Sequence, residues 1–299
     1  MRKFLKYLGL AVLGLMGLLA VLLGVVFYKS GVMLRRQYHV TVAPPVLPTD
    51  PAAIARGQHL AATRGCLDCH GPDLGGAKVI DDPAMGRLYG PNLTLGPGGR
   101  GPAFSDADFV RAIRHGLAPD GRGLFLMPST DYSRFTESDM ADLIAYVKSV
   151  PPVNRARVPL TVGPVARALM LAGKIRLAAD EIDHANLRPA TVTPAISVEY
   201  GRYVAASCTG CHGPNLSGGK IDIGPPDWPP AANLTPHASG RLASWSEADF
   251  LRVLRDSKRP DGTELSPVMP RAFSGLSETE MKALWTYLRT LPAVETGAR

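Results

Sequence analysis

Two five-residue stretches contain all four cysteines of the chain, and a histidine directly follows each pair. They are Cys66-Leu67-Asp68-Cys69-His70 and Cys208-Thr209-Gly210-Cys211-His212. Two thiols one helical turn apart can each form a thioether with one vinyl group of the same porphyrin, so C-x-x-C-H predicts covalent attachment of a c-type haem. The imidazoles of His70 and His212 would then lie beneath the iron as proximal ligands. The sequence therefore predicts two haem c groups.

Three other uses of paired cysteines fit these stretches less well. A thioredoxin-like redox pair is expected at a strand-to-helix turn of a βαβ unit, and the sequence predicts no β-rich segment beside either stretch. A four-cysteine zinc site usually separates its pairs by about 15 to 20 residues, whereas a whole domain separates these two. Structural disulfides would leave both histidines without a role. Haem attachment is the interpretation that gives a role to both cysteines and to the histidine of each motif.

The sequence downstream of each motif is repeated, which indicates a duplicated domain. The repeated segments, first copy and then second, are 71–76 and 213–219, 92–94 and 233–235, 104–109 and 245–250, and Met127-Pro128 and Met269-Pro270. The separation of His70 from Met127 equals that of His212 from Met269. A thioether is a soft donor suited to haem iron, and Met/His ligation raises the reduction potential. Met127 and Met269 are therefore the predicted sixth ligands.

Other methionines and histidines are weaker candidates. Met140 and Met281 also repeat, but each begins an apolar stripe at helical spacing, which predicts a place in the core. Met127 and Met269 instead precede proline in Gly/Pro-rich stretches, where a loop can cover the distal face of the haem. Met85 has no partner in the repeat. The remaining histidines are not predicted ligands, with His184 and His237 expected at the surface: His39, His59, His115, His184 and His237.

Length and charge limit the classes of function. The 299 residues have room for a membrane segment and two domains of about 100 residues, and 31 glycines and 27 prolines indicate many irregular loops. The formal net charge of +7 is concentrated before residue 53 and in residues 154–195. The two haem domains are therefore close to neutral, and nothing in the sequence supports binding to nucleic acid.

The N-terminal segment predicts a membrane anchor. Residues 7–28 carry no charge and, as a helix, would rise about 33 Å, enough to cross a hydrocarbon core of roughly 30 Å. No small-x-small cleavage site follows, which favours an uncleaved anchor over a signal peptide. The flanking charges are balanced and do not fix the orientation. Because bacterial c-type haem is attached outside the cytoplasmic membrane, we expect an inner-membrane protein with its N-terminus inside and its haem domains in the periplasm.

We divide the chain into five segments: a membrane anchor at 1–30, a Pro-rich tether at 31–52, a first haem domain at 53–153, a linker at 154–195 and a second haem domain at 196–299. Predicted helices cover 52–60, 106–115, 137–150 and 278–291, with Thr136 as an N-cap. We also predict a single amphipathic helix over 165–179, in a linker that packs between the domains and fixes the distance between the haems.

The motifs together resemble those of class I cytochrome c over residues 53–295. The resemblance rests on two copies of C-x-x-C-H-G, the Asn-Leu-Thr stretches, the Met-Pro loops and a closing helix that ends in Val-Pro-Pro or Leu-Pro. More narrowly, the chain is similar to the multihaem cytochrome c subunits of membrane-bound alcohol, aldehyde and gluconate dehydrogenases. Those subunits carry three haem domains and a C-terminal anchor, whereas this chain has two and an N-terminal span. The dihaem subunit of cbb3-type oxidases is also similar in plan.

The resemblance implies a mainly α fold, in which one N-terminal transmembrane helix precedes two tandem class I cytochrome c domains. With both axial positions of each iron filled, we predict an electron-transfer protein and not an enzyme. It would carry electrons from a dehydrogenase or a quinol-oxidising complex to a terminal acceptor. The expected partners are a dehydrogenase or oxidase subunit, or a soluble cytochrome or copper protein. The alternatives are a dihaem peroxidase with one open haem, and a haem-relay subunit of an oxidase.

Overall fold

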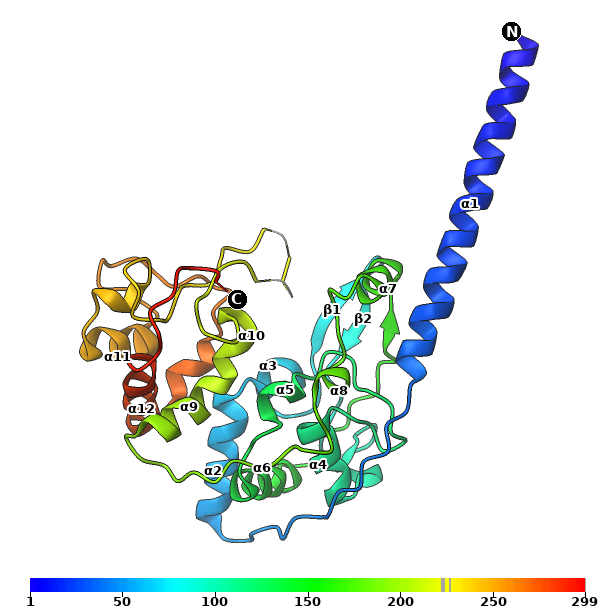
Figure 1. Ribbon diagram of the computed structural model, residues 1–299. Helices are drawn as coiled ribbons and strands as arrows, with labels where there is room; N and C mark the ends of the chain where they lie inside the picture. The colour runs from blue at the N-terminus through cyan, green and yellow to red at the C-terminus, as the bar shows by residue number, and fades with distance from the viewer. Residues whose placement is uncertain (222–223, 226, 299) are drawn as a thin grey trace.

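The computed structural model describes residues 1–221, 224–225 and 227–298, and shows a long N-terminal helix attached to a body of two helical lobes (Figure 1). Helix α1 (Arg2–Arg35) extends away from the body and continues past the predicted boundary at residue 30. Within the described residues it is the one helix long and apolar enough to cross a membrane, and none of its most apolar stretch is buried. Residues 37–50 then run along the first lobe, where the Tyr38 amide donates to the Gly121 carbonyl.

The first lobe contains six helical segments and a short β-hairpin. In chain order they are α2 (Pro51–Thr63), α3 (Cys66–His70), β1 (Lys78–Asp82), β2 (Gly86–Tyr89), η1 (Gly101–Ala103), α4 (Asp106–His115), α5 (Ser129–Tyr132) and α6 (Glu137–Ser149). Helix α4 has its predicted bounds. The predicted N-cap of α6 is confirmed, since the Thr136 hydroxyl accepts a hydrogen bond from the Asp139 amide at 3.0 Å.

The hairpin corrects the expectation that no β structure lies beside the first motif. Strands β1 and β2 are antiparallel, and β2 also pairs with β3 (Thr161–Val162) from the linker. The sheet of three short antiparallel strands contains no parallel βαβ unit. The sheet therefore does not support the interpretation of the cysteines as a thioredoxin-like redox pair.

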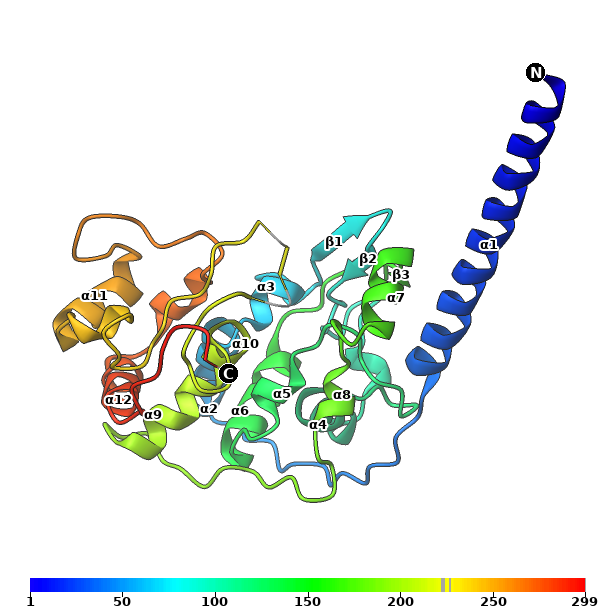
Figure 2. The same ribbon diagram turned by 45° about the horizontal axis from the view of Figure 1, so that its top comes forward.

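The linker differs from its prediction in two respects. It forms two short helices, α7 (Pro164–Leu171) and α8 (Ala178–Glu181), and not one helix over 165–179, because Gly173 adopts a left-handed φ of 69° just after α7. Its helices also do not lie between the lobes. They pack on the side of the first lobe nearest the anchor, with α7 against α1 and α8 against α5 (Figure 2). The Arg167 guanidinium donates to the Ser30 hydroxyl at 2.9 Å, which ties the linker to α1.

The second lobe repeats the plan of the first. Its elements are α9 (Val198–Ala205), η2 (Ala206–Cys208), α10 (Thr209–His212), η3 (Arg241–Ala243), α11 (Glu247–Asp256), η4 (Arg271–Gly275) and α12 (Glu278–Leu288). Helix α12 ends at Leu288 and not at the predicted residue 291. The repeated capping boxes explain why α4 and α11 begin where they do, because Ser105 and Asp108, and likewise Ser246 and Asp249, satisfy each other's backbone amides.

In both lobes the first helix crosses the last at a glycine. A Cβ atom on Gly57 of α2 would lie 2.0 Å from the Asp142 carbonyl oxygen of α6, and one on Gly201 of α9 would lie 2.0 Å from the Ala283 carbonyl oxygen of α12. The two backbones therefore touch, and no side chain fits between them. A glycine inside a predicted helix is the sequence signal for such a contact, and our sequence analysis did not use it.

Gly201→Ala is expected to destabilise the second lobe by about 3 kcal/mol, at the upper end of the usual cost of overpacking, because α9 and α12 must move apart to admit a methyl group. Urea unfolding of the purified protein, followed by far-UV circular dichroism, measures the loss. Gly210→Ala is the control, since the nearest atom to a Cβ there is 3.8 Å away. Equal losses in the two variants would contradict the close-crossing account.

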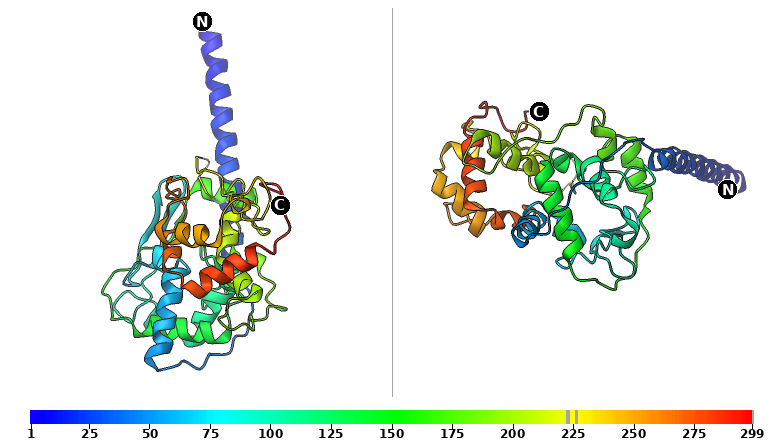
Figure 3. Two further views of the ribbon diagram at one scale, coloured as in Figure 1. Left: turned by 90° about the vertical axis from the view of Figure 1, so that its left-hand side faces the viewer. Right: turned by 90° about the horizontal axis from the view of Figure 1, so that it is seen from below.

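The lobes contact each other through a pseudo-symmetric pair of hydrogen bonds at the junction that Figure 3 shows from two further sides. His59 Nε2 of α2 lies 2.6 Å from Glu280 Oε2 of α12, and the Tyr203 hydroxyl of α9 donates to Asp139 Oδ2 of α6 at 2.5 Å. Each donor follows its crossing glycine by one turn or less, and each acceptor lies in the first turn of a closing helix. The relation between the lobes thus rests on direct contacts and not on the linker helices.

Candidate haem sites

Each C-x-x-C-H motif forms a short helical turn next to the core of its lobe. In the first lobe the motif is α3, and in the second it spans the end of η2 and α10. Residues three apart on a helix lie on the same face, so Cys66 and Cys69 can reach one porphyrin edge. Cys66 packs against the first core and Cys208 against the second, and no disulfide joins any of the four cysteines.

Both motif histidines are buried and held in one orientation. The Nδ1 atom of His70 lies 2.9 Å from the Pro91 carbonyl oxygen, and Nδ1 of His212 lies 2.7 Å from the Ala232 carbonyl oxygen. Because a carbonyl oxygen can only accept, Nδ1 carries the proton and Nε2 keeps its lone pair. Burial lowers the pKa of both imidazoles, which favours this neutral form. A neutral imidazole fixed through its other nitrogen is the usual arrangement of a metal-ligating histidine.

A repeated asparagine holds each of these carbonyl groups in place. Asn92 directly follows Pro91, and its Nδ2 donates to the Val153 carbonyl oxygen at 2.8 Å, while its Oδ1 accepts from the amide and hydroxyl of Thr94. Asn233, which follows Ala232, makes the same bonds in the second lobe. The repeat in the sequence suggests that Asn92 and Asn233 order the loop beside a haem propionate, and these hydrogen bonds show that each asparagine orders its loop. The asparagines tie the loop beside the histidine to the segment that follows the closing helix.

The thiols do not have the properties of a redox pair or of a zinc site. Burial raises the pKa of Cys66 and of Cys208 to about 12, and it also raises the pKa of Cys69 and Cys211. A thiol with a raised pKa is a poor nucleophile in disulfide exchange, whereas redox-active cysteines have lowered pKa values. The described residues contain no cluster of three or more His, Cys, Asp or Glu side chains that could hold a metal ion.

The two predicted sixth ligands lie in loops that face the same cores as the cysteines. Met127 comes just before α5 and packs against the core that Cys66 contacts, and Met269 comes just before η4 and packs against the core that Cys208 contacts. Met140 and Met281, at 0% and 1% exposed, are confirmed as core residues. Met85 packs in a separate cluster between the sheet and α7, apart from both motifs.

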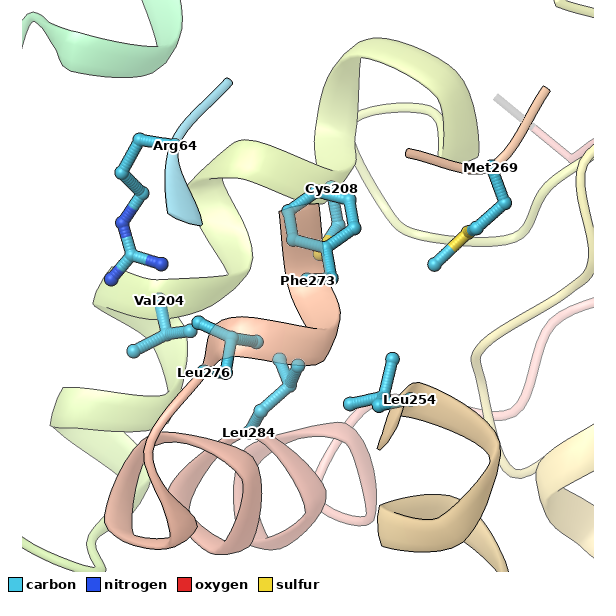
Figure 4. Close-up of a pocket in the computed structure, with 8 residues that line it drawn as sticks. All are labelled: Arg64, Val204, Cys208, Leu254, Met269, Phe273, Leu276 and Leu284. Atoms are coloured by element: carbon cyan, nitrogen blue, oxygen red, sulfur yellow. The ribbon is translucent and has the colours of Figure 1, made fainter. Parts of the chain in front are cut away.

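A cavity in the second lobe joins the motif to the predicted axial methionine (Figure 4). Cys208 and Met269 line it together with apolar side chains and one residue from the first lobe, in full Arg64, Val204, Leu254, Phe273, Leu276 and Leu284. The cavity thus contains one thiol and one thioether, and its walls are apolar apart from Arg64. The second lobe also supplies the Cys211 thiol and the His212 imidazole with its free Nε2 from the same motif. This set fits a covalently attached haem, which needs vinyl partners, two axial ligands and surroundings of low polarity.

One pair of histidines lies outside the haem sites. His115 at the end of α4 is buried, and its Nδ1 lies 3.0 Å from Nδ1 of His184 in the linker. The expectation that His184 is a surface residue is therefore wrong, since it is half-buried in this contact. Burial and the neighbouring His184 lower the pKa of His115 to about 4. The second lobe has Asp256 in the place of His115, so the pair belongs to the seam between linker and first lobe.

Comparison with known proteins identifies the family. The cytochrome c family matches residues 54–151 and residues 198–292, one region in each lobe and together more than half of the chain. The chain belongs to the cytochrome c family. This confirms the resemblance drawn from the motifs, and with it the mainly α fold of two tandem cytochrome c regions. The cytochrome binds two haem c groups covalently, and it transfers electrons rather than catalysing a reaction.

Several relatives match across both lobes of this cytochrome. The fructose dehydrogenase cytochrome subunit of Gluconobacter japonicus is 30% identical over 284 residues, which cover 85% of this chain and 57% of the relative. A diheme cytochrome c-type protein of Cereibacter sphaeroides is 28% identical over 81% of this chain and 86% of its own length. The gluconate 2-dehydrogenase cytochrome c subunit of Pantoea cypripedii is 28% identical over 82% and 61%. The chain thus spans little more than half the length of the two dehydrogenase subunits.

Proposed function

We propose that this cytochrome relays electrons through two haems at the periplasmic face of the bacterial inner membrane, from a membrane-associated dehydrogenase to a terminal acceptor. The similarity to cytochrome subunits of fructose and gluconate dehydrogenases supports a dehydrogenase as the donor. The exposed apolar surface of α1 supports anchoring in a membrane. The N-terminus is inside the cell in this proposal because bacterial c-type haem is attached outside the cytoplasmic membrane. The donor subunit and a soluble cytochrome or copper protein are the partners in this proposal.

The proposed haem contacts repeat in the two lobes. Cys66 and Cys69, and likewise Cys208 and Cys211, would hold the haems through thioethers. His70 with Met127, and His212 with Met269, would ligate the two irons. When bound, each haem supplies a one-electron couple at its iron. The backbone carbonyls of Pro91 and Ala232 hold the histidine rings in place and raise their basicity. The loops that contain Met127 and Met269 would cover the other side of each haem and exclude water from it.

One observation favours an electron carrier over a dihaem peroxidase. Both lobes place a methionine against the core beside the motif, and both leave the histidine Nε2 without a hydrogen bond to the described part of the chain. A peroxidase requires one iron with an open axial position, so the two lobes should differ at this point. Their equivalence supports two closed haems that exchange electrons only.

We further propose the segment boundaries 1–30, 31–52, 53–153, 154–195 and 196–299 for the anchor, tether, first haem domain, linker and second haem domain. The matched regions, 54–151 and 198–292, support the two domains. The packing of α1 on α7 supports a first domain close to the membrane, with the second domain beside the first on the side away from α1 (Figure 1).

Reduction of the haems in native membranes tests the proposed function. We expect the addition of a sugar, sugar acid or alcohol that the host oxidises to reduce both haems when the terminal oxidases are inhibited, as followed by the visible haem bands. Membranes from a strain that carries Cys208→Ala/Cys211→Ala should show only half of this absorbance change. If no such substrate reduces the haems while chemical reductants do, a dehydrogenase is not the donor. Protease added to intact spheroplasts should degrade the haem domains, and protection would contradict the periplasmic placement.

A further inference from the structure

The junction between the lobes contains one feature that is present only in the first copy of the repeat. The segment from the crossing glycine to the first cysteine is two residues longer in the first copy, because Arg64 and Gly65 have no counterparts between Ser207 and Cys208. Arg64 caps the end of α2, and Gly65 follows with a left-handed φ of 77°. The insertion therefore places an arginine beside the first haem motif, at the junction of the lobes.

The side chain of Arg64 crosses that junction and becomes buried in the second lobe. It is 2% exposed, and its Nη2 donates to Glu280 Oε1 at 2.9 Å. Its Nη1 is buried and has no hydrogen-bond partner among the residues that the structure describes. Arg64 is also the one residue of the first lobe that lines the cavity between Cys208 and Met269 (Figure 4). A buried guanidinium with an unused N–H costs stability unless a further group occupies that cavity.

The charges at this point are fixed near neutral pH. An arginine guanidinium is a permanent cation in proteins. Burial alone would raise the pKa of Glu280, but the hydrogen bond from His59 and the charge of Arg64 hold that pKa at about 2. Because the side chains of Arg64 and Glu280 are 2% and 3% exposed, their charges are weakly screened. A cation favours the reduced form of a neighbouring haem, which carries one more electron, and a carboxylate favours the oxidised form.

We propose that Arg64 of the first lobe completes the haem site of the second lobe, and that its ion pair with Glu280 sets the reduction potential of that haem relative to the other. The inference rests on the haem attachment proposed above and adds an interlobe determinant to it. Because the two charges act in opposite directions, their separate removal has opposite effects. The carboxylate at the pseudo-symmetric position, Asp139, is hydrogen-bonded to Tyr203 and supports the interface without a cation.

Redox titration of purified full-length protein, followed at the haem bands, tests this. Arg64→Gln should lower the potential of the second haem by about 59 mV, a tenfold change in its one-electron equilibrium, and Glu280→Gln should raise it by a similar amount. The double variant should lie between them, and Arg64→Lys should stay close to the wild type. The titration has one one-electron step for each haem. The step whose potential falls in the Met269→His variant belongs to the second haem, since exchange of methionine for histidine lowers the reduction potential.

Controls distinguish an effect of charge from a loosened interface between the lobes. They also distinguish failure of this inference from failure of the proposed function. Asp139→Asn should leave the second haem's potential unchanged. Shifts of Arg64→Gln and Glu280→Gln in the same direction, or no shift in either, would overturn the inference. The haem content of each variant is measured first. If the wild-type protein carries no covalent haem, the proposed attachment is refuted. If the variants carry two haems and their reduction potentials equal those of the wild type, only the role of Arg64 is refuted.

Discussion

Replacement of both Cys208 and Cys211 by alanine is expected to leave one covalent haem per chain instead of two. Without the two thiols, the second haem would be held only by its axial ligands and would be lost on denaturation. The apolar cavity beside Cys208 would lose its occupant, so the second lobe should also unfold at lower urea concentration. The mass of the denatured protein, together with haem staining after denaturing electrophoresis, measures the change.

The other motif provides the matched comparison. Cys66→Ala/Cys69→Ala should also retain one haem, and the quadruple variant should retain none. The two double variants should differ in which lobe becomes protease-sensitive. Two covalent haems in either double variant would show that the attachment residues lie elsewhere in the chain.

Met269→Ala is expected to open the distal side of the second haem. The thioether is the predicted sixth ligand, and its removal leaves a small apolar side chain that cannot bind iron. The ferrous variant should therefore bind carbon monoxide, and the haem's equilibrium for reduction should fall by at least tenfold, about 59 mV for one electron. A carbon monoxide titration and a redox titration of the purified variant measure the two effects. Met127→Ala should act in the same way on the first haem.

A core methionine serves as the control for these variants. Met281 is 1% exposed in the core of the second lobe, and Met281→Leu preserves most of its volume. We expect this variant to keep the spectrum and potential of the wild type. If Met281→Leu opened the haem and Met269→Ala did not, the assignment of ligand and core methionine would have to be reversed.

The parts of the fold that depend on short stretches of sequence could be predicted. The C-x-x-C-H motif carries its thiols and imidazole within five residues, so its chemistry does not depend on distant parts of the chain. The bounds of α4 and the start of α6 follow from local capping, with Ser105 and Thr136 accepting hydrogen bonds from backbone amides. The prediction of Met127 and Met269 as axial ligands needed only the register of the repeat, which is also a property of the sequence.

Features that join distant segments were missed or wrongly predicted. The linker helix was extended over Gly173, although a glycine with φ of 69° ends it. The hairpin β1–β2 has few buried side chains, so it lacks the alternating pattern that would reveal a strand. The bonds of His59 and Arg64 to Glu280 span more than 200 residues, and no local pattern pairs them. These contacts are visible only once the lobes are placed side by side.

The central claim is that both haems are closed to external ligands and act only as electron carriers. The most direct test is the optical spectrum of the purified wild-type protein, oxidised and reduced, during titration with cyanide and carbon monoxide. The account predicts low-spin haems in both states, the weak red absorbance band of methionine-ligated ferric haem, and no ready binding of either ligand. A high-spin component, or immediate binding of carbon monoxide by one haem, would contradict it and would favour a peroxidase-type enzyme.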